Sequence, residues 1–241
     1  MSIVLRARGL TKRYGDMVVV NDVNFDVPAG GVMSLIGPNG AGKSTIFNLL
    51  TGYTPLNAGS VEFAGQMLNG MPTHRIAALG IARAFQIARP FRGLSVRDNV
   101  RVGALFGRAG ARDVEASIDL ALRLANLADL AEEPASTLTI GQLRKLELAR
   151  AVAARPTLLL ADEPLAGLVP AESDEILASF RDMVNHGMTI LLVEHDMPAV
   201  MQISDHVVVL EAGAFIAEGR PEVVARDPRV IEAYLGQELP Q

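Results

Sequence analysis

The chain contains no cysteine, and none of its apolar runs approaches the length of a membrane-spanning helix. Without thiols, disulfide and thiolate chemistry are excluded, which suits a reducing compartment. A helix that crosses a bilayer needs about 20 apolar residues, so we expect no transmembrane segment. We also expect no signal peptide, because Met1–Arg6 is short and soon charged. If the protein works at a membrane, we expect another chain to hold it there.

Positive charge is not in excess either. Lys and Arg total 22 against 27 Asp and Glu, which gives a formal net charge of −5. A chain with this balance has no global electrostatic attraction to nucleic acid, so we expect no nucleic-acid partner. Hydrophobic residues make up 49% of the 241 positions. The sequence therefore predicts a globular protein with a substantial core, either one large domain or a core with a lobe.

One stretch carries the most information about function: Gly37-Pro38-Asn39-Gly40-Ala41-Gly42-Lys43-Ser44-Thr45. It fits the pattern G-x-x-x-x-G-K-[ST], follows the strand-like run Val32–Ile36 and leads into a helical pattern. Its glycines let backbone N–H groups surround anionic oxygens, and the start of the helix adds further donors. Lys43 supplies a charge for the β- and γ-phosphates and Ser44 a hydroxyl for Mg²⁺. This context favours a phosphate-binding loop over a glycine-rich turn with a surface lysine.

Two carboxylates end a predicted buried strand. The run Leu158–Ala161 leads directly into Asp162 and Glu163, and ligands bind at the carboxyl edge of α/β sheets. Asp162 supplies the oxygen ligand that Mg²⁺ prefers, directly or through water. Glu163, one residue further on, is placed to polarise an attacking water. The alternative is that both carboxylates are charges at a helix N-terminus and have no chemical role.

A histidine follows a second strand of the same kind. His195 comes shortly after Ile190–Val193, so we expect it at the same sheet edge. An imidazole at that edge can hydrogen-bond a γ-phosphate oxygen. The alternative is a histidine satisfied by its neighbours Glu194 or Asp196.

Three further features are less specific, and two of them allow two interpretations. Thr139 and Gln142 form a Thr-x-x-Gln capping box before a predicted helix. Alternatively, that helix start faces a phosphate, and Gly141 leaves its backbone N–H groups open. Gln86 by itself is a surface glutamine. Tyr14 either stacks on a base or packs within a β lobe.

The remaining pattern predicts an α/β protein. Alternating apolar residues near the start predict a small antiparallel sheet, which Ser60–Phe63 joins. Helical periodicity covers about Gln86 to Ala154, and another helix lies between the two buried strands. Val207–Leu210 and Phe215–Ala217 predict a hairpin, and Val230–Leu235 predicts a short helix.

Together, these segments resemble the nucleotide-binding subunit of an ATP-binding cassette (ABC) transporter, in the family's order and over nearly the whole chain. The phosphate loop is similar to Walker A, Leu159–Glu163 to Walker B with its catalytic glutamate, and His195 to the switch histidine. Gln86 stands at the Q-loop position, and Tyr14 stands where the family stacks adenine. Leu138–Gln142 occupies the place of the signature, usually Leu-Ser-Gly-Gly-Gln.

The resemblance implies a P-loop (RecA-like) nucleotide-binding core with an N-terminal antiparallel β subdomain and an inserted helical subdomain. Within a single ABC domain of residues 1–241, about 1–85 and 155–220 would form the β lobe and core. About 86–154 would form the helical subdomain, and 221–241 a C-terminal tail. Phe91, Leu94 and Val96 are candidates for a docking surface on the helical subdomain, and ordinary packing is the alternative.

The resemblance also implies an ATPase that uses ATP and Mg²⁺. Lys43 and the loop amides would hold the triphosphate. Ser44, Asp162 and Gln86 would arrange the metal ion and the water.

Further roles follow from the same resemblance. Glu163 would orient or deprotonate the nucleophile, and His195 would steady the transferred phosphoryl group. In the family, the signature of one subunit closes over ATP held by the other. Thr139, Gly141 and Gln142 would therefore serve a nucleotide site formed mainly by a second chain.

A narrower resemblance is to the ATPases of branched-chain amino-acid importers. It rests on phrases such as Ala82–Gln86, Glu163–Leu168 and the tail stretches Ile216–Gly219 and Asp227–Gly236. It implies uptake of branched-chain amino acids or related small polar solutes. The implied partners are a second ATP-binding subunit, transmembrane permease subunits and, indirectly, a solute-binding protein. The expected location is cytoplasmic and peripheral, on the inner face of the cell membrane.

Three residues depart from the family pattern: Thr139 and Ile140 in the signature, and Val169 where the D-loop usually has Asp or Asn. The loss of a polar contact at Val169 predicts weaker communication between two ATP sites. Two alternatives stay open, an ABC-type regulatory module with little turnover and an exporter ATPase. A GTPase or small-molecule kinase lacks support, because the sequence has no Asn-Lys-x-Asp guanine-recognition motif.

Overall fold

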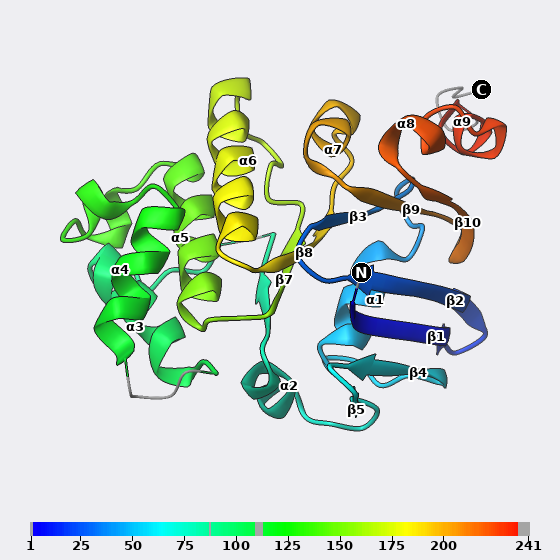
Figure 1. Ribbon diagram of the computed structural model, residues 1–241, viewed down its shortest axis with the longest axis horizontal. Helices are drawn as coiled ribbons and strands as arrows, with labels where there is room; N and C mark the ends of the chain where they lie inside the picture. The colour runs from blue at the N-terminus through cyan, green and yellow to red at the C-terminus, as the bar shows by residue number, and fades with distance from the viewer. Residues whose placement is uncertain (1, 87, 109–112, 236–241) are drawn as a thin grey trace. The chain divides into compact units, whose positions relative to one another are not determined.

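A computed structural model describes residues 2–86, 88–108 and 113–235 (Figure 1). Gly236 and the rest of the predicted tail, 236–241, lie outside the described residues. The chain divides into two compact units. Unit 1 comprises Met1–Ile76 and Leu191–Gln241, and unit 2 comprises Ala77–Ile190.

Unit 1 contains the predicted antiparallel sheet, which is confirmed as four strands in the order β2-β1-β4-β5. Figure 1 shows β1 and β2 in blue beside β4 in cyan. The strands are β1 (Ile3–Tyr14), β2 (Met17–Pro28), β4 (Ala58–Phe63) and β5 (Gln66–Met67). Alternate residues of β1 and β2 point into the core, as strand geometry requires.

The alternation of β2 is interrupted by a bulge. Leu10 pairs with Val23 and Lys12 with Val20, so β2 uses one residue more than β1 over this stretch. Asp22 lies within the bulge, at φ 52°. The extra residue lets Val20 and Val23 both face the core although they are three positions apart.

The rest of unit 1 combines one parallel and one antiparallel strand pair with helices. Strand β3 pairs in parallel with β9, and β9 pairs antiparallel with β10, which confirms the predicted hairpin. Figure 1 shows α8 and α9, in red, beside this hairpin. These elements are β3 (Val32–Ile36), α1 (Lys43–Leu50), α7 (Met197–Ile203), β9 (His206–Glu211), β10 (Ala214–Gly219), α8 (Pro221–Val224) and α9 (Pro228–Leu235).

An apolar cluster in unit 1 joins the end of β3 to the C-terminal helices. Its buried members come from β3, α7, the hairpin, α8 and α9. They are Ile36, Val200, Val207, Val209, Ala217, Val224 and Val230, with Met197, Ile216 and Tyr234 packed against them. Ile36 is the last residue before the glycine-rich loop, so this cluster supports the base of that loop.

The boundaries between the two units fall within two elements: α2 (Thr73–Leu79), which the sequence patterns did not predict, and β8 (Thr189–Val193).

Unit 2 has strands β6 and β7 paired in parallel. Its elements are β6 (Ile81–Ala84), α3 (Val96–Phe106), α4 (Val114–Leu124), η2 (Ala128–Leu130), η3 (Ala135–Thr137), α5 (Ile140–Ala153), β7 (Leu158–Asp162) and α6 (Pro170–Asn185). The predicted buried strands in β7 and β8 are confirmed, since all their residues are buried.

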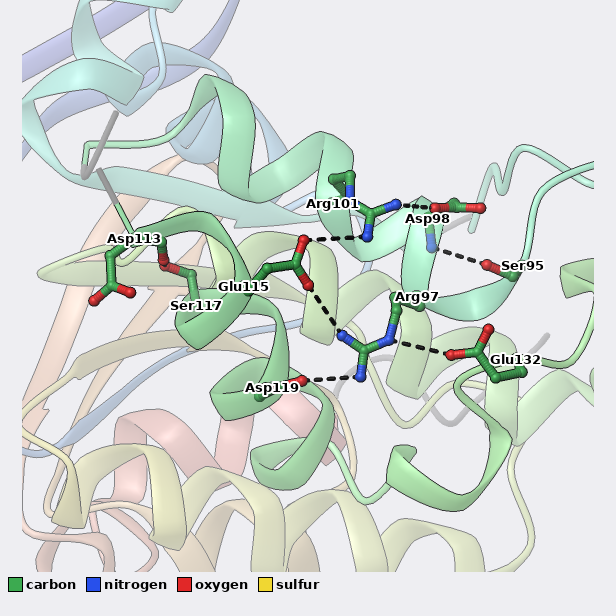
Figure 2. A network of polar contacts seen from close by, with 9 residues as sticks. All are labelled: Ser95, Arg97, Asp98, Arg101, Asp113, Glu115, Ser117, Asp119 and Glu132. Atoms are coloured by element: carbon green, nitrogen blue, oxygen red, sulfur yellow. Dashed lines mark hydrogen bonds and ion pairs between the residues drawn. The ribbon is translucent and has the colours of Figure 1, made fainter. Parts of the chain in front are cut away.

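Helices α3, α4 and α5 pack on one another in unit 2. A polar network reinforces the α3–α4 pair (Figure 2). Arg97 on α3 contacts Glu115 and Asp119 on α4, at 3.3 and 2.9 Å, and Glu132 at 3.2 Å. Arg101 shares Glu115 at 3.2 Å. The hydrogen bond to Asp119 raises the pKa of Arg97 above its ordinary value, against a smaller lowering by burial.

Among the described residues, no helix is both long and apolar enough to cross a membrane.

Candidate functional site

The predicted phosphate loop connects β3 to α1 in unit 1 and is closed by its own lysine. Lys43 is only 6% exposed. Its Nζ donates to the carbonyl oxygens of Gly37 at 2.6 Å and Pro38 at 2.9 Å. The Ala41 N–H donates to the Pro38 oxygen at 3.2 Å. The loop therefore curls around a buried cationic group, which concentrates positive charge where an anion would bind.

Two glycines of the loop have no room for a side chain. Gly42 caps α1 in the left-handed region at φ 94°, and a Cβ there would lie 2.8 Å from the Val19 oxygen. Gly37 has φ +149°, and its Cβ would lie 2.1 Å from the Leu210 oxygen. Because Gly42 provides no capping side chain, the first-turn N–H groups of α1 are left for an anion. The cradle thus fits a phosphate group.

Tyr14 ends β1 with its side chain half in solvent. The residue is 50% exposed, and the Lys12 Nζ lies 5.0 Å from the centre of its ring. The ring is therefore in contact with a lysine ammonium group and half exposed, which leaves ring surface for stacking. The stacking role stays a prediction.

His195 lies just beyond β8, next to a buried carboxylate. Glu194 is fully buried, and its Oε2 accepts the backbone N–H of His195 at 3.1 Å. The same oxygen is 3.8 Å from the His195 Nδ1, while the imidazole is 57% exposed. Asp196 instead caps α7 by accepting the Ala199 N–H at 3.1 Å. Glu194 thus neighbours the histidine, as the alternative interpretation expected, but the exposed ring keeps a phosphate-contact role open.

In unit 2, two predicted site residues are brought together. The Gln86 Nε2 donates to the Glu163 Oε2 at 2.5 Å. Glu163 has φ 45°, a left-handed conformation that is costly for a residue with a Cβ. Backbone strain of this kind occurs often at functional sites. The geometry thus supports a special role for Glu163 and connects Gln86 to it.

Asp162 has a partner that the sequence patterns did not reveal. The Arg83 Nη2 contacts its Oδ2 at 2.5 Å, and the Arg83 and Asp162 side chains are 9% and 8% exposed. The signal was present, since Arg83 is a charged residue inside the apolar strand β6 and so requires a buried partner. Arg83 also lies over the Phe85 ring at 4.8 Å. Arg83 therefore fixes the orientation of Asp162 at the end of β7.

The predicted ligands for Mg²⁺ are Ser44, Gln86 and Asp162. In the part of the chain that the structure describes, no group of three or more His, Cys, Asp or Glu side chains could hold a metal ion. Mg²⁺ in nucleotide sites uses one or two protein ligands together with phosphate and water. The oxygen donors of Ser44 and Asp162 are of the right chemical type for such a site.

The start of α5 forms the predicted capping box. The Thr139 N–H donates to the Gln142 Oε1 at 2.9 Å, and the Gln142 N–H donates to the Thr139 Oγ1 at 3.3 Å. A Cβ on Gly141 would lie 2.5 Å from the Glu172 Oε1, so a larger residue here would displace the Glu172 side chain. Glu172 in turn accepts the Val169 N–H at 3.3 Å. The local structural role is thus present, and phosphate contact stays a prediction.

Helix α5 also holds the segment that follows β6. Burial raises the pKa of Glu147 above its ordinary value, opposed by Arg150 and by a hydrogen bond from the Phe85 backbone. Arg150 donates to the Arg89 oxygen at 3.1 Å and lies over the Phe91 ring at 5.4 Å. The segment between β6 and α3 is therefore anchored to the helix that begins at the capping box.

One part of the predicted docking surface is wrong. Val96 is fully buried, because it is the first residue of α3 and points into the helix packing. Phe91 and Leu94 are 48% and 40% exposed. Asn99 holds this loop by accepting the Phe91 N–H at 2.8 Å and donating to the Phe91 oxygen at 3.0 Å.

Comparisons with known families and proteins agree with these features. Residues 20–166 match the family described as ABC transporter. Residues 216–239 match the family described as branched-chain amino acid ATP-binding cassette transporter. The second match covers the hairpin strand β10 and the C-terminal helices.

Individual relatives are similar over nearly their full length. The chain is 41% identical to BraF of Pseudomonas aeruginosa, a high-affinity branched-chain amino acid transport ATP-binding protein, over 97% of this chain and 98% of BraF. It is 40% identical to LivG of Escherichia coli K12, which has the same description, with 97% and 98% covered. A crystal structure of the ADP conformation of an ABC transporter's ATP-binding cassette matches with a TM-score of 0.89 at 29% identity, over 98% of this chain and 100% of that one.

Proposed function

We propose that this chain, which belongs to the ABC transporter family, powers the uptake of branched-chain amino acids or related small polar solutes. ATP binding and hydrolysis follow from the family membership. One observation carries the solute class. The chain is similar to two branched-chain amino-acid transport ATPases over 97% of its length, and its residues 216–239 match the family described as branched-chain amino acid ATP-binding cassette transporter.

Lys43 and the amides of the loop bind the triphosphate in this proposal. The buried lysine and the uncapped start of α1 support that role. When bound, Mg²⁺ would neutralise charge on the phosphates. Ser44 and Asp162 would be its protein ligands, and Gln86 would help to arrange the metal ion and the water. Arg83 holds the Asp162 carboxylate in one orientation.

Glu163 orients or deprotonates the attacking water. Its left-handed backbone and its 2.5 Å hydrogen bond from Gln86 support this assignment, because both limit the positions of the carboxylate. His195 steadies the transferred phosphoryl group through its exposed imidazole. Tyr14 stacks on the adenine.

The active form is a pair of ATP-binding subunits. Thr139, Gly141 and Gln142 would contact ATP held by the second subunit, with the α5 capping box fixing their backbone. Permease subunits would dock on the loop that exposes Phe91 and Leu94. A solute-binding protein would act through the permease. Because this chain would dock on the permease subunits, it would lie at the inner face of the membrane. Residues of about 86–154 would form the helical subdomain of such a cassette.

Leucine uptake by the assembled transporter tests the proposal. The chain is purified with its permease subunits, reconstituted in vesicles with ATP inside, and supplied with leucine-loaded binding protein. We expect ATP-dependent leucine accumulation and a binding-protein-stimulated ATPase rate. Glu163→Gln is expected to abolish both while an ATP-dependent dimer accumulates, and Glu133→Gln, an exposed carboxylate outside the site, is the matched control.

Each contrary outcome has a distinct meaning. Stimulation by a sugar and not by leucine would contradict the solute class. Rapid turnover by Glu163→Gln would remove that residue from catalysis. An assembled wild-type complex without steady-state turnover would favour the regulatory module.

A further inference from the structure

An arginine inside strand β6 contacts the carboxylate that ends β7. Arg83 pairs with Leu160 in the parallel register of the two strands. Side chains two residues apart lie on the same face of a strand, so Asp162 lies on the face that Arg83 shares. The Arg83 Nη2 contacts the Asp162 Oδ2 at 2.5 Å, and both side chains are almost fully buried. The register of two neighbouring strands therefore brings this pair together away from water.

The Arg83 guanidinium has a second contact within its own segment of the chain. It lies over the Phe85 ring, 4.8 Å from the ring centre. An aromatic face attracts a guanidinium, and the attraction strengthens where water is excluded. Phe85 and Asp162 together limit where the guanidinium can lie. The guanidinium in turn limits the rotation of the Asp162 carboxylate.

Stability alone does not explain why β6 carries this arginine. Two charges that leave water lose their hydration, and replacing a buried ion pair by apolar residues is often neutral or stabilising. The other residues of β6 are Ile81, Ala82 and Ala84, so an apolar residue would suit this strand. The pair is better explained by a task of Asp162, whose carboxylate is the proposed Mg²⁺ ligand.

The contact leaves Asp162 suited to bind a metal ion. A carboxylate has two oxygens, and the hydrogen bond from Arg83 uses Oδ2. A carboxylate that is already held in place loses less conformational freedom when an ion binds to it. Residues that orient a metal ligand from outside the ligand shell typically contribute about 10- to 100-fold in metal affinity. Arg83 has the position and the chemistry of such a residue.

We propose that Arg83 is a positioning residue for Mg²⁺, which holds Asp162 in place and thereby sets the Mg²⁺ concentration at which nucleotide binding strengthens. The inference rests on the proposed role of Asp162 as a metal ligand. It gives β6 a task in metal binding in addition to its place in the sheet. Nucleotide binding without a metal ion does not use Asp162, so it should not depend on Arg83.

Arg83→Met in the full chain tests the proposal, because methionine fills part of the same space without a charge. Binding of a non-hydrolysable ATP analogue is measured by calorimetry in EDTA and over a series of Mg²⁺ concentrations. We expect an unchanged dissociation constant in EDTA. The Mg²⁺ concentration that gives half of the strengthening should rise about ten-fold or more. The unfolding midpoint should fall, since the variant leaves a buried carboxylate without its cation.

Lys145→Met is the matched control. Lys145 forms an ion pair with Glu175 in unit 2, its side chain is also 9% exposed, and neither residue belongs to the candidate site. This variant should lower the unfolding midpoint and leave the Mg²⁺ dependence of binding at its wild-type value. Arg83→Lys is a second test, and it decides the matter if Arg83→Met does not fold. Because lysine keeps a cation but lacks the planar guanidinium, we expect a smaller shift in the same direction.

Three results would overturn the proposal. The first is an unchanged Mg²⁺ dependence in the folded Arg83 variants. The second is an equal shift in Lys145→Met, which would mean that lost stability alone accounts for the effect. The third is an equal loss of binding in EDTA, which would mean that Arg83 acts on the nucleotide site as a whole. If Asp162→Asn keeps the wild-type Mg²⁺ dependence, the metal-ligand assignment itself fails, which is a separate result.

Discussion

The phosphate loop and the α3–α4 pair are held in place by different kinds of interaction. In the loop, a lysine that is 6% exposed binds main-chain oxygens, and the preceding strand ends in an apolar cluster. In the α3–α4 pair, Arg97 binds carboxylates whose side chains are 46% to 83% exposed. Water and salt screen exposed charges far more than buried ones. We therefore expect the contacts that hold the loop to be little affected by salt, and those between α3 and α4 to weaken as the salt concentration rises.

The largest expected effect comes from removing the buried cation of the loop. Lys43→Ala should weaken ATP binding by more than about 100-fold, because each lost charge-assisted hydrogen bond is worth about 1.5 to 3 kcal/mol. Calorimetric titration with ATP measures the effect, and thermal unfolding checks that the variant is folded. Unchanged affinity would mean that the loop does not hold the phosphates. The difference drawn between the buried lysine of the loop and the exposed ion pairs of α3 and α4 would then have no functional meaning.

A smaller effect is expected on the exposed side of the comparison. Arg97→Ala should lower the free energy of unfolding by about 1 to 2 kcal/mol, since several weak pairs share one guanidinium. The loss should shrink as NaCl rises from about 0.05 to 1 M. Urea unfolding at both salt concentrations measures it. Arg229→Ala, which removes one exposed pair with Asp227, is the control and should have almost no effect. A loss that salt does not change would contradict the screening argument.

The smallest expected effect is the pH dependence of stability that the buried Tyr234 hydroxyl produces. The pKa of Tyr234 is raised to about 12 by burial, so the folded state holds its proton more tightly than the unfolded state. Its contribution is present below the unfolded pKa of about 10 and is lost as pH rises toward the folded value. Between about pH 9 and 11, the wild type should lose about 1 kcal/mol more stability than Tyr234→Phe. Parallel urea curves for the two proteins measure this difference, and identical pH slopes would contradict the burial of the hydroxyl.

Local pattern predicted much of the fold. The buried strands β7 and β8, the β9–β10 hairpin and the capping box of α5 were all expected, because each depends on residues within about ten positions. The bulge of β2 was not expected, since it depends on register against β1. Val96 was a docking candidate with ordinary packing as the alternative, and its burial shows that the packing alternative holds.

The candidate site shows the same limit. The residue types in the loop and at the end of β7 were recognisable from spacing. The Arg83–Asp162 pair was not, since it joins residues far apart in the chain. Such contacts follow from how the elements pack, which no short motif encodes. The roles of the site residues stay predictions that the variants above will test.

The close approach of Gly141 to Glu172 limits how this chain can vary. Even a methyl group at position 141 would displace the Glu172 side chain in the first turn of α6. Glu172 also accepts a hydrogen bond from the Val169 N–H, and the Arg144 side chain on α5 donates to the Ala166 oxygen at 3.4 Å. The beginning of α5 is therefore linked to the turn before α6 by the Arg144 hydrogen bond as well as by the Gly141–Glu172 approach. We expect a displacement of one of these segments to be felt by the other.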